Sequence, residues 1–331
     1  APELAVSRTG TLAYLPAADT AGALGLVGRD GTFQPLGLPR GDYYQPRVSP
    51  DGRFVAYLVN EGRNRAVHVY DLQRGTTTKL TPQAVDEQDS RDMGLAWHPD
   101  GRSLGITSSR GKEASGIYLR NLDGREQLLV KAEAYSTRNF SWAPDGKQLA
   151  CTLQNGSLHD IWVQTMGEKP ATQPLVNSAA SEHSPAFSPD GRWMAYASDE
   201  SGRFEVYLRG YPQGERLAVS TSGGIGPAWR RDGKELYFEG HVDGALKMMA
   251  VAATPDGASL RLAKPVPLFD LRAKGSAEVI EQYARSGNAG RMYDVLPDGR
   301  FLMFRGADPG GIRESVVVQN GFEELKRLAG K

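Results

Sequence analysis

One short turn recurs along the chain and constrains its fold more than any other feature. Ser188-Pro189-Asp190-Gly191 lies between two apolar segments, and its proline, aspartate and glycine each favour a tight turn for a different conformational reason. Related turns recur, and each leads into a short strand-like run. The aspartates of the six clear copies are Asp51, Asp100, Asp145, Asp190, Asp232 and Asp298. Because every copy needs its aspartate for the turn, we expect these carboxylates to be structural.

Most copies are separated by roughly 40 to 50 residues, which is the period of a four-stranded propeller blade. A worn copy at Ser7–Thr11 adds a seventh unit. The sequence therefore predicts an all-β fold, a seven-bladed β-propeller of four-stranded antiparallel blades, with six blades as the alternative. The whole chain, 1–331, is predicted to be a single domain. Its blades are placed at about 1–40, 41–82, 83–131, 132–178, 179–221, 222–270 and 291–320, with an insertion at 271–290 and a short terminal helix at 321–331.

The ends of the chain pose a problem of closure. Four strands are predicted between Leu4 and Leu38, and the first of them, Leu4–Val6, is interpreted as an inner strand. The last unit has Ser315–Val318 as its third strand and no clear fourth. We therefore expect either a three-stranded last blade or an N-terminal extension that this chain lacks.

Composition excludes some classes of function. Lys plus Arg and Asp plus Glu both number 39, so the formal charge is zero, which argues against binding nucleic acid through its phosphates. The single cysteine, Cys151, permits no internal disulfide and is expected in the core. No apolar run approaches the roughly 20 residues of a membrane span, so we expect no direct membrane insertion. We also expect the chain to be monomeric.

The repeated Ser-Pro-Asp-Gly-Arg turn resembles that of the TolB-like, WD-related β-propellers, and the resemblance covers nearly the whole chain. The segments Phe187–Tyr196, Asp160–Val163, Ser220–Gly224 and Val316–Asn320 are similar to propellers at the C-terminus of bacterial serine/threonine kinases. That resemblance implies the sensor or interaction part of a larger, membrane-anchored bacterial signalling protein. The chain itself has neither the glycine-rich nucleotide loop nor the His-Arg-Asp triplet of a kinase.

The leading ends of the inner strands are the predicted binding site. They differ between units and mix arginine, carboxylate, amide and histidine, which suits a ring of polar groups around one mouth of the channel. Arginines there favour a small anionic ligand, and a protein partner is the other candidate. The predicted ligand-binding residues are Tyr43, Arg91, Asp92, Arg138, Asn139, Glu182, His183 and Arg291. The leading hypothesis is a non-catalytic module that binds a ligand or a protein.

The alternative is a hydrolase of esters or phosphoesters with its active site at the channel mouth. Its candidate catalytic residues are His183, Glu182 and Asp92, which are also the candidate ligands of a divalent metal; no other cofactor is identified. Adjacent residues of a strand point to opposite faces, so Glu182 and His183 act together only if a bulge intervenes. Related propellers also precede the hydrolase domain of prolyl-oligopeptidase-type enzymes, but we expect no Gly-x-Ser-x-Gly nucleophile elbow in this chain and therefore not that peptidase.

Overall fold

The computed structural model describes residues 4–6, 12–14, 21–61, 64–81, 91–109, 116–131, 139–167, 169–257, 259–271, 291–306 and 316–318. These residues form an all-β structure, and none of them lies in a helix. The terminal helix predicted at 321–331 and residues 272–290 of the insertion predicted at 271–290 lie outside the described residues.

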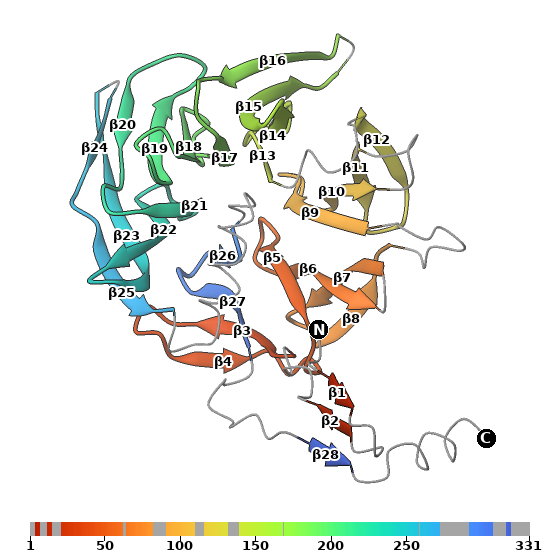
Figure 1. The fold of residues 1–331 in the computed structure, drawn as a ribbon. Helices are drawn as coiled ribbons and strands as arrows, with labels where there is room; N and C mark the ends of the chain where they lie inside the picture. Colours follow the sequence, from red (N-terminus) through yellow and green to blue (C-terminus); the bar gives the residue numbers. More distant parts are fainter. Residues whose placement is uncertain are drawn as a thin grey trace.

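Six four-stranded antiparallel blades surround a central axis (Figure 1). The prediction of seven blades is therefore wrong, and the alternative of six blades is confirmed. The first blade contains β5 Tyr43–Val48, β6 Phe54–Glu61, β7 Asn64–Asp71 and β8 Thr76–Lys79. The second contains β9 Arg91–Trp97, β10 Ser103–Ser109, β11 Gly116–Asn121 and β12 Glu126–Lys131. The third contains β13 Phe140–Trp142, β14 Gln148–Asn155, β15 Leu158–Thr165 and β16 Ala171–Val176.

The next two blades follow the same pattern, with one extension. The fourth contains β17 Glu182–Phe187, β18 Trp193–Ser198, β19 Glu205–Gly210 and β20 Arg216–Ala218. The fifth contains β21 Gly224–Trp229, β22 Glu235–Val242, β23 Ala245–Asp256 and β25 Val266–Asp270. The end of the long strand β23 also pairs with β24, Ser259–Leu262, so a hairpin projects beyond this blade.

The sixth blade combines strands from the two ends of the chain. Its inner pair is β26 Tyr293–Val295 and β27 Phe301–Arg305, and its outer pair is β3 Ala23–Val27 and β4 Phe33–Pro35. Strand β27 pairs with β3, so Leu302 lies opposite Leu26. This pairing gives β27 and β3 partners on both sides and completes a four-stranded blade, so the strand that a three-stranded last blade would leave as its outer edge is paired.

The closure corrects the predicted first and last units. Strands β1 Leu4–Val6, β2 Leu12–Tyr14 and β28 Val316–Val318 form a separate three-stranded sheet in the order β1-β2-β28. The worn turn between β1 and β2 therefore marks no seventh blade. Local sequence could not reveal this, because strands β3 and β4 gain their inner partners from residues nearly the whole chain away.

The repeated turns have the role that their sequence predicts. In each of the six clear copies the aspartate Oδ1 accepts a hydrogen bond from the backbone N–H two residues later, as in Asp190 with Arg192 at 3.1 Å. The following glycine has a positive φ, for example +75° at Gly52. A Cβ at Gly52 would lie 2.9 Å from Pro297 of the preceding blade's turn, so the glycine also allows neighbouring turns to approach each other.

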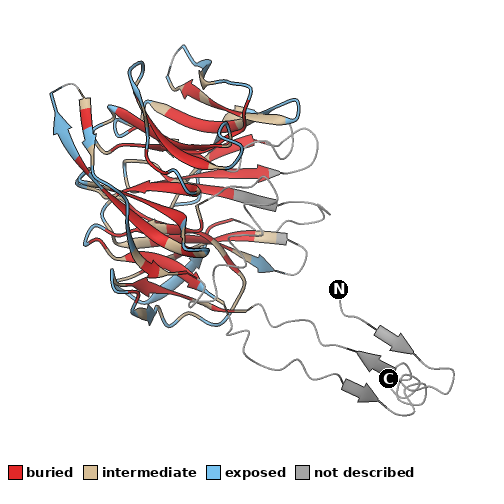
Figure 2. Cartoon of the chain, turned by 60° about the vertical axis from the view of Figure 1, so that its left-hand side comes forward, coloured by how far each residue is buried: buried red, intermediate tan, exposed pale blue. Residues whose placement is uncertain are grey.

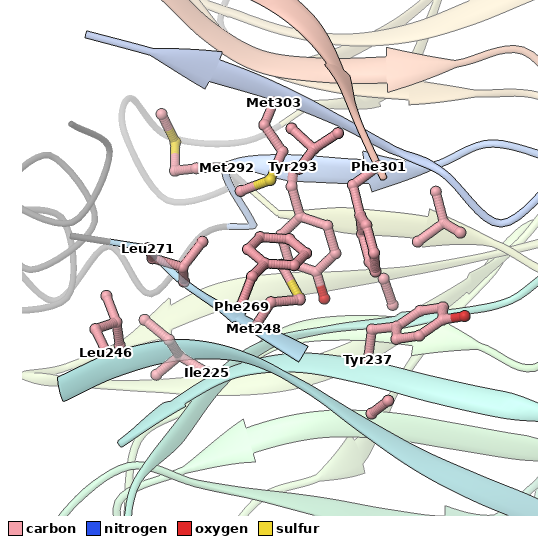
Figure 3. Packing of buried hydrophobic residues seen from close by; sticks show 14 residues of the cluster. Ile225, Tyr237, Leu246, Met248, Phe269, Leu271, Met292, Tyr293, Phe301 and Met303 are labelled. Atoms are coloured by element: carbon pink, nitrogen blue, oxygen red, sulfur yellow. The ribbon is translucent and has the colours of Figure 1, made fainter. Parts of the chain in front are cut away.

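The hydrophobic core lies between the faces of adjacent blades. Buried residues follow the inner and middle strands, whereas outer strands such as β8 are exposed (Figure 2). Between the fifth and sixth blades, Phe301 lies edge-on to Tyr237 and Phe269, with ring centroids 4.9 and 5.5 Å apart (Figure 3). Cys151 is fully buried in another such cluster, and burial raises the pKa of its thiol to about 12, as expected for a core residue.

Candidate functional site at the propeller axis

Hydrogen bonds between neighbouring inner strands hold the axis of the propeller together. Asp294 Oδ2 accepts from the backbone N–H of Val48 at 2.8 Å, and Ser141 Oγ accepts from the N–H of Phe187 at 3.1 Å. The indole N–H of Trp97 donates to Arg47 O at 3.0 Å across another blade boundary. The inner strands are thus fixed relative to one another, which is the rigid support that a site at the axis needs.

A cavity of about 340 Å³ lies at the axis, toward the ends of the inner strands that lead into the repeated turns. This volume is at the lower end of the range typical for small-molecule sites. Prolines and aromatic rings alternate with polar groups on its walls. The lining residues are Arg47, Val48, Pro50, Ala96, Trp97, Pro99, Asn139, Phe140, Ser141, Trp142, Pro144, Ser184, Pro185, Ala186, Phe187, Ser188, Pro189, Pro227, Trp229, Arg231, Arg291, Asp294 and Val295.

The guanidinium of Arg47 closes one part of this cavity and is itself almost fully buried. Among the described residues it donates only to carbonyl oxygens: to Pro46 at 2.9 Å, Leu95 at 3.2 Å, Arg291 at 3.1 Å and Tyr293 at 3.4 Å. These carbonyls belong to the second and sixth blades as well as its own. Burial, reinforced by the nearby charge of Arg291, lowers the pKa of Arg47 to about 9, so this side chain is a cation at neutral pH.

Two further arginines line the cavity. Arg291 Nη2 pairs with Asp294 Oδ1 at 3.0 Å, while its buried Nε has no hydrogen-bond partner. Arg231 Nη2 donates to Val48 O at 3.0 Å and Ser49 O at 2.9 Å, so it reaches from the fifth blade to the first. Burial lowers the pKa of Arg231 from its usual value.

A buried carboxyl lies on β22 of the fifth blade, close enough to Arg291 and Arg47 to interact with their charges. Glu239 is 1% exposed, and neither of its carboxyl oxygens has a hydrogen-bond partner. Burial raises its pKa to about 8, against the opposing influence of Arg291 and Arg47. Glu239 is therefore largely protonated at neutral pH and leaves the positive charge of the arginines only weakly compensated.

The structure separates the residues predicted to form one binding ring. Asn139 and Arg291 line the axial cavity, whereas Tyr43, Glu182 and His183 do not. Tyr43 is a core residue: its hydroxyl donates to Pro39 O, and its ring lies edge-on to Tyr57 at 5.2 Å. The side chains of Arg91, Asp92 and Arg138 lie outside the described residues, so their predicted role stays a prediction.

Glu182 and His183 contact different groups. Glu182 Oε1 accepts from Ser178 Oγ, its Oε2 has no partner, and burial raises its pKa. The His183 ring lies 4.6 Å from that of His159 and 5.4 Å from that of Phe204, between centroids. Burial, followed by the influence of His159, lowers the pKa of His183 to about 4, so it is neutral at physiological pH. A bulge does follow His183, with Ser184 at a φ of +55°, but the bulge does not bring the two side chains into contact through any observed hydrogen bond.

The described part of the chain contains one match to a nucleophile motif and no metal-binding cluster. No group of three or more His, Cys, Asp or Glu residues there is arranged to hold a metal ion. Residues 101–105 read Gly-Arg-Ser-Leu-Gly and match the Gly-x-Ser-x-Gly pattern of hydrolase nucleophiles, a match overlooked when the chain is divided into repeats. Ser103 nevertheless begins strand β10, is 4% exposed, and has its Oγ 2.8 Å from Asp100 Oδ2 and 2.9 Å from Asn121 Oδ1, so it is a structural serine.

Two arginines of the cavity were missed from sequence, although both depart from the repeat. Arg231 occupies the place that proline takes in the other five clear turns. Arg47 stands four residues before its turn aspartate, where other units have the small residues Ala96, Ser141, Ala186 and Ala228. It follows a bulge at Gln45, whose φ is +45°, and such a bulge changes which residues face the axis.

The fold and cavity define a six-bladed β-propeller with an arginine-containing axial site. A sequence profile of the TolB β-propeller domain, PD40, matches residues 83–263, which is more than half of the chain. The chain therefore belongs to the TolB β-propeller domain family, as its turns predicted.

The chain is also similar in sequence to individual proteins. The chain is 23% identical over 210 residues to the uncharacterised peptidase YuxL of Bacillus subtilis, covering 49% of this chain and 31% of YuxL. It is 30% identical over 111 residues to the Tol-Pal system protein TolB of Alcanivorax borkumensis, covering 33% of this chain and 26% of that protein. The chain thus spans only about a third or less of the length of these two relatives.

Solved structures show the same fold. A protein assigned as TolB from Agrobacterium tumefaciens has a TM-score of 0.61 at 18% identity, covering 87% of this chain and 99% of that one. An oligogalacturonate lyase from Vibrio parahaemolyticus has a TM-score of 0.52 at 12% identity, covering 97% and 82%. At these identities the likeness concerns the fold alone. In the described residues, no helix is both long and apolar enough to span a membrane.

Proposed function

We propose that this propeller is a non-catalytic binding module, the sensor or interaction part of a larger bacterial signalling protein. The observation that carries the proposal is the axial cavity, which combines apolar walls with three arginines. Such a combination supports recognition, because apolar walls supply affinity and a few fixed polar groups supply specificity. The kinase-associated propellers that the chain resembles, and the Tol-Pal system named for one relative, are consistent with this role.

The polar groups around the axis favour binding over turnover. His183 is buried against aromatic rings and neutral, and the turn aspartates accept hydrogen bonds within their own turns. Burial lowers the pKa of His183 to about 4, far below the value near 7 that suits a general base at neutral pH. The cavity is therefore the place where a ligand or a segment of a partner protein is expected to bind.

A substitution that fills the cavity tests the proposal. Pro99 lines the cavity at the second position of its turn, where most residues are tolerated, so Pro99→Trp is expected to narrow the cavity without unfolding the blade. Val266→Trp is the matched control, because Val266 is 51% exposed on the outer strand β25. The purified chain is used to capture partners or ligands from an extract of the encoding bacterium, and each captured species is then purified and titrated against the three proteins.

We expect saturable binding that Pro99→Trp weakens about tenfold or more, equivalent to about 1.4 kcal/mol, and that Val266→Trp leaves unchanged. Equal binding by all three proteins would contradict a role for the cavity. A parallel screen on esters and phosphoesters, with and without divalent metal, addresses the hydrolase alternative. Robust turnover that is lost in His183→Ala would replace the binding proposal with that alternative.

A further inference from the structure

The turns at the cavity end of the propeller form a ring in which one member is exceptional. The residue before the turn aspartate is proline in five blades, and the four prolines Pro50, Pro99, Pro144 and Pro189 line the cavity. In the fifth blade this position is Arg231. The turn itself does not require an arginine, because the same backbone hydrogen bonds close the proline-containing turns: Gly233 N–H donates to Arg230 O at 2.9 Å, as Gly52 N–H donates to Ser49 O.

The guanidinium of Arg231 is fixed in place without a direct ion pair among the described residues, and the carboxylates of Asp294 and Asp51 act on its charge only from a distance. Its Nη2 is held by two main-chain carbonyls, those of Val48 and Ser49, at 3.0 and 2.9 Å. Among the described residues Arg231 takes part in no ion pair, and its Nε and Nη1 make no hydrogen bond. Carbonyls immobilise a guanidinium without neutralising it, so its remaining donors are preorganised for an anion.

The charge of the described cavity walls is also unbalanced. Arg47, Arg231 and Arg291 line the cavity, and Asp294 is the one carboxylate that lines it with them. Asp294 is paired with Arg291, and the donors of Arg47 are directed to carbonyls. Two guanidinium charges therefore face a half-enclosed space in a chain whose overall charge is zero.

We propose that the axial cavity binds an oxyanion, a carboxylate or a phosphate, carried on a small apolar body, with Arg231 as its direct ligand and Arg291 beside it. This proposal rests on the proposed binding function and specifies its ligand chemistry. Proline rings and the aromatic walls, among them Trp142, receive the apolar body, and a volume of about 340 Å³ limits its size. Arg47 acts as a positioning residue, because its bonds to three blades fix the carbonyls around the site.

Four small probes separate the parts of this proposal. Benzoate and phenyl phosphate carry the two oxyanions on one ring, benzyl alcohol carries no charge, and benzylamine carries a positive charge. Binding is measured by calorimetry and by tryptophan fluorescence, since three of the five tryptophans, Trp97, Trp142 and Trp229, line the cavity. We expect at least one of the two anions to bind saturably, both neutral and cationic probes to bind at least tenfold more weakly, and the anion affinity to fall as salt rises. The comparison of benzoate with phenyl phosphate identifies the preferred oxyanion.

Variants assign the binding to Arg231. Arg231→Gln and Arg231→Pro should each weaken anion binding at least tenfold, and Arg231→Pro recreates the turn sequence of the other blades. Arg102→Gln is the control, because Arg102 is an exposed arginine beside the turn of the second blade. Melting temperatures establish whether each variant is folded. If one of the two Arg231 variants does not fold, the other still provides the test.

The outcomes distinguish this proposal from the proposed function. If benzyl alcohol binds as well as the anions, or Arg231→Gln binds them like the parent chain, the oxyanion site is refuted. If no probe binds, but a captured partner binds the parent chain more tightly than Pro99→Trp, the proposed ligand chemistry is wrong and the binding function stands. If neither probes nor partners bind in a manner that depends on the cavity, both proposals fail.

Discussion

Asp294 joins the last inner strand of the ring to the first, because its Oδ2 accepts the backbone N–H of Val48 at 2.8 Å. Its other oxygen holds Arg291 at 3.0 Å. The ring of inner strands has no covalent closure at this point, so the carboxylate contributes to stability through a contact between segments nearly 250 residues apart in the chain.

Removal of this carboxylate should destabilise the propeller. Asp294→Ala leaves the Val48 N–H and the Arg291 guanidinium without their acceptor, which costs about 1–3 kcal/mol of unfolding free energy. Asp294→Asn keeps an acceptor and should cost less. Urea unfolding measures both, and Asp256→Ala, which removes an exposed partner of Arg261, is the control with an expected loss below about 1 kcal/mol. Equal losses at positions 294 and 256 would contradict the closing role.

The contact between neighbouring turns gives a second prediction. Gly52 and Gly244 have φ values of +75° and +74°, so alanine at either position costs about 1–2 kcal/mol in backbone strain. Only at Gly52 would the new Cβ also collide with a neighbour, Pro297 at 2.9 Å, whereas nothing lies within 4 Å at Gly244. Gly52→Ala should therefore lower the melting temperature more than Gly244→Ala. Identical shifts would mean that the turns do not rely on this close approach.

Glu239 should make stability depend on pH. Its folded pKa of about 8 lies above the ordinary value of 4.5, so the folded protein keeps a proton that the unfolded chain releases, and stability falls as the pH rises from about 4.5 toward 8. Glu239→Gln removes this dependence. We expect the variant to gain stability relative to the parent chain by a few kcal/mol between pH 5 and 8, as measured by urea unfolding at each pH. Parallel pH curves for the two proteins would contradict a protonated Glu239.

His183 should make stability depend on pH in the direction opposite to Glu239, so that stability falls as the pH is lowered. Its folded pKa of about 4 lies below 6.5, so its contribution to stability is complete above about pH 6.5 and is lost as the pH falls through 4. His183→Gln should reduce acid destabilisation by about 1–3 kcal/mol between pH 6.5 and 4. His241→Gln, at an exposed histidine of the β22–β23 hairpin, is the matched control. An NMR titration of His183 near pH 6.5 would refute the assigned burial effect.

Sequence predicted the features of this fold that are local and repeated. The turn aspartates, the alternation of strands and the buried Cys151 follow from residues within a few positions of one another. The number of blades could not be predicted from such local patterns, because strands β3 and β27 pair across most of the chain and resemble no local motif. The cavity was predicted only in part: Asn139 and Arg291 line it, but the bulges at Gln45 and Gly226 alter the facing of inner-strand residues, which simple alternation cannot anticipate.

The shared sixth blade has a consequence for how the protein is made. Strands β3 and β4 are synthesised before all other blade strands and have no inner neighbours until β26 and β27 have been synthesised. At ordinary translation rates this interval lasts about 15 to 50 seconds, during which a hydrophobic strand edge is open to wrong pairing. Nascent chains of this protein are therefore expected to need chaperone protection until the final strands emerge.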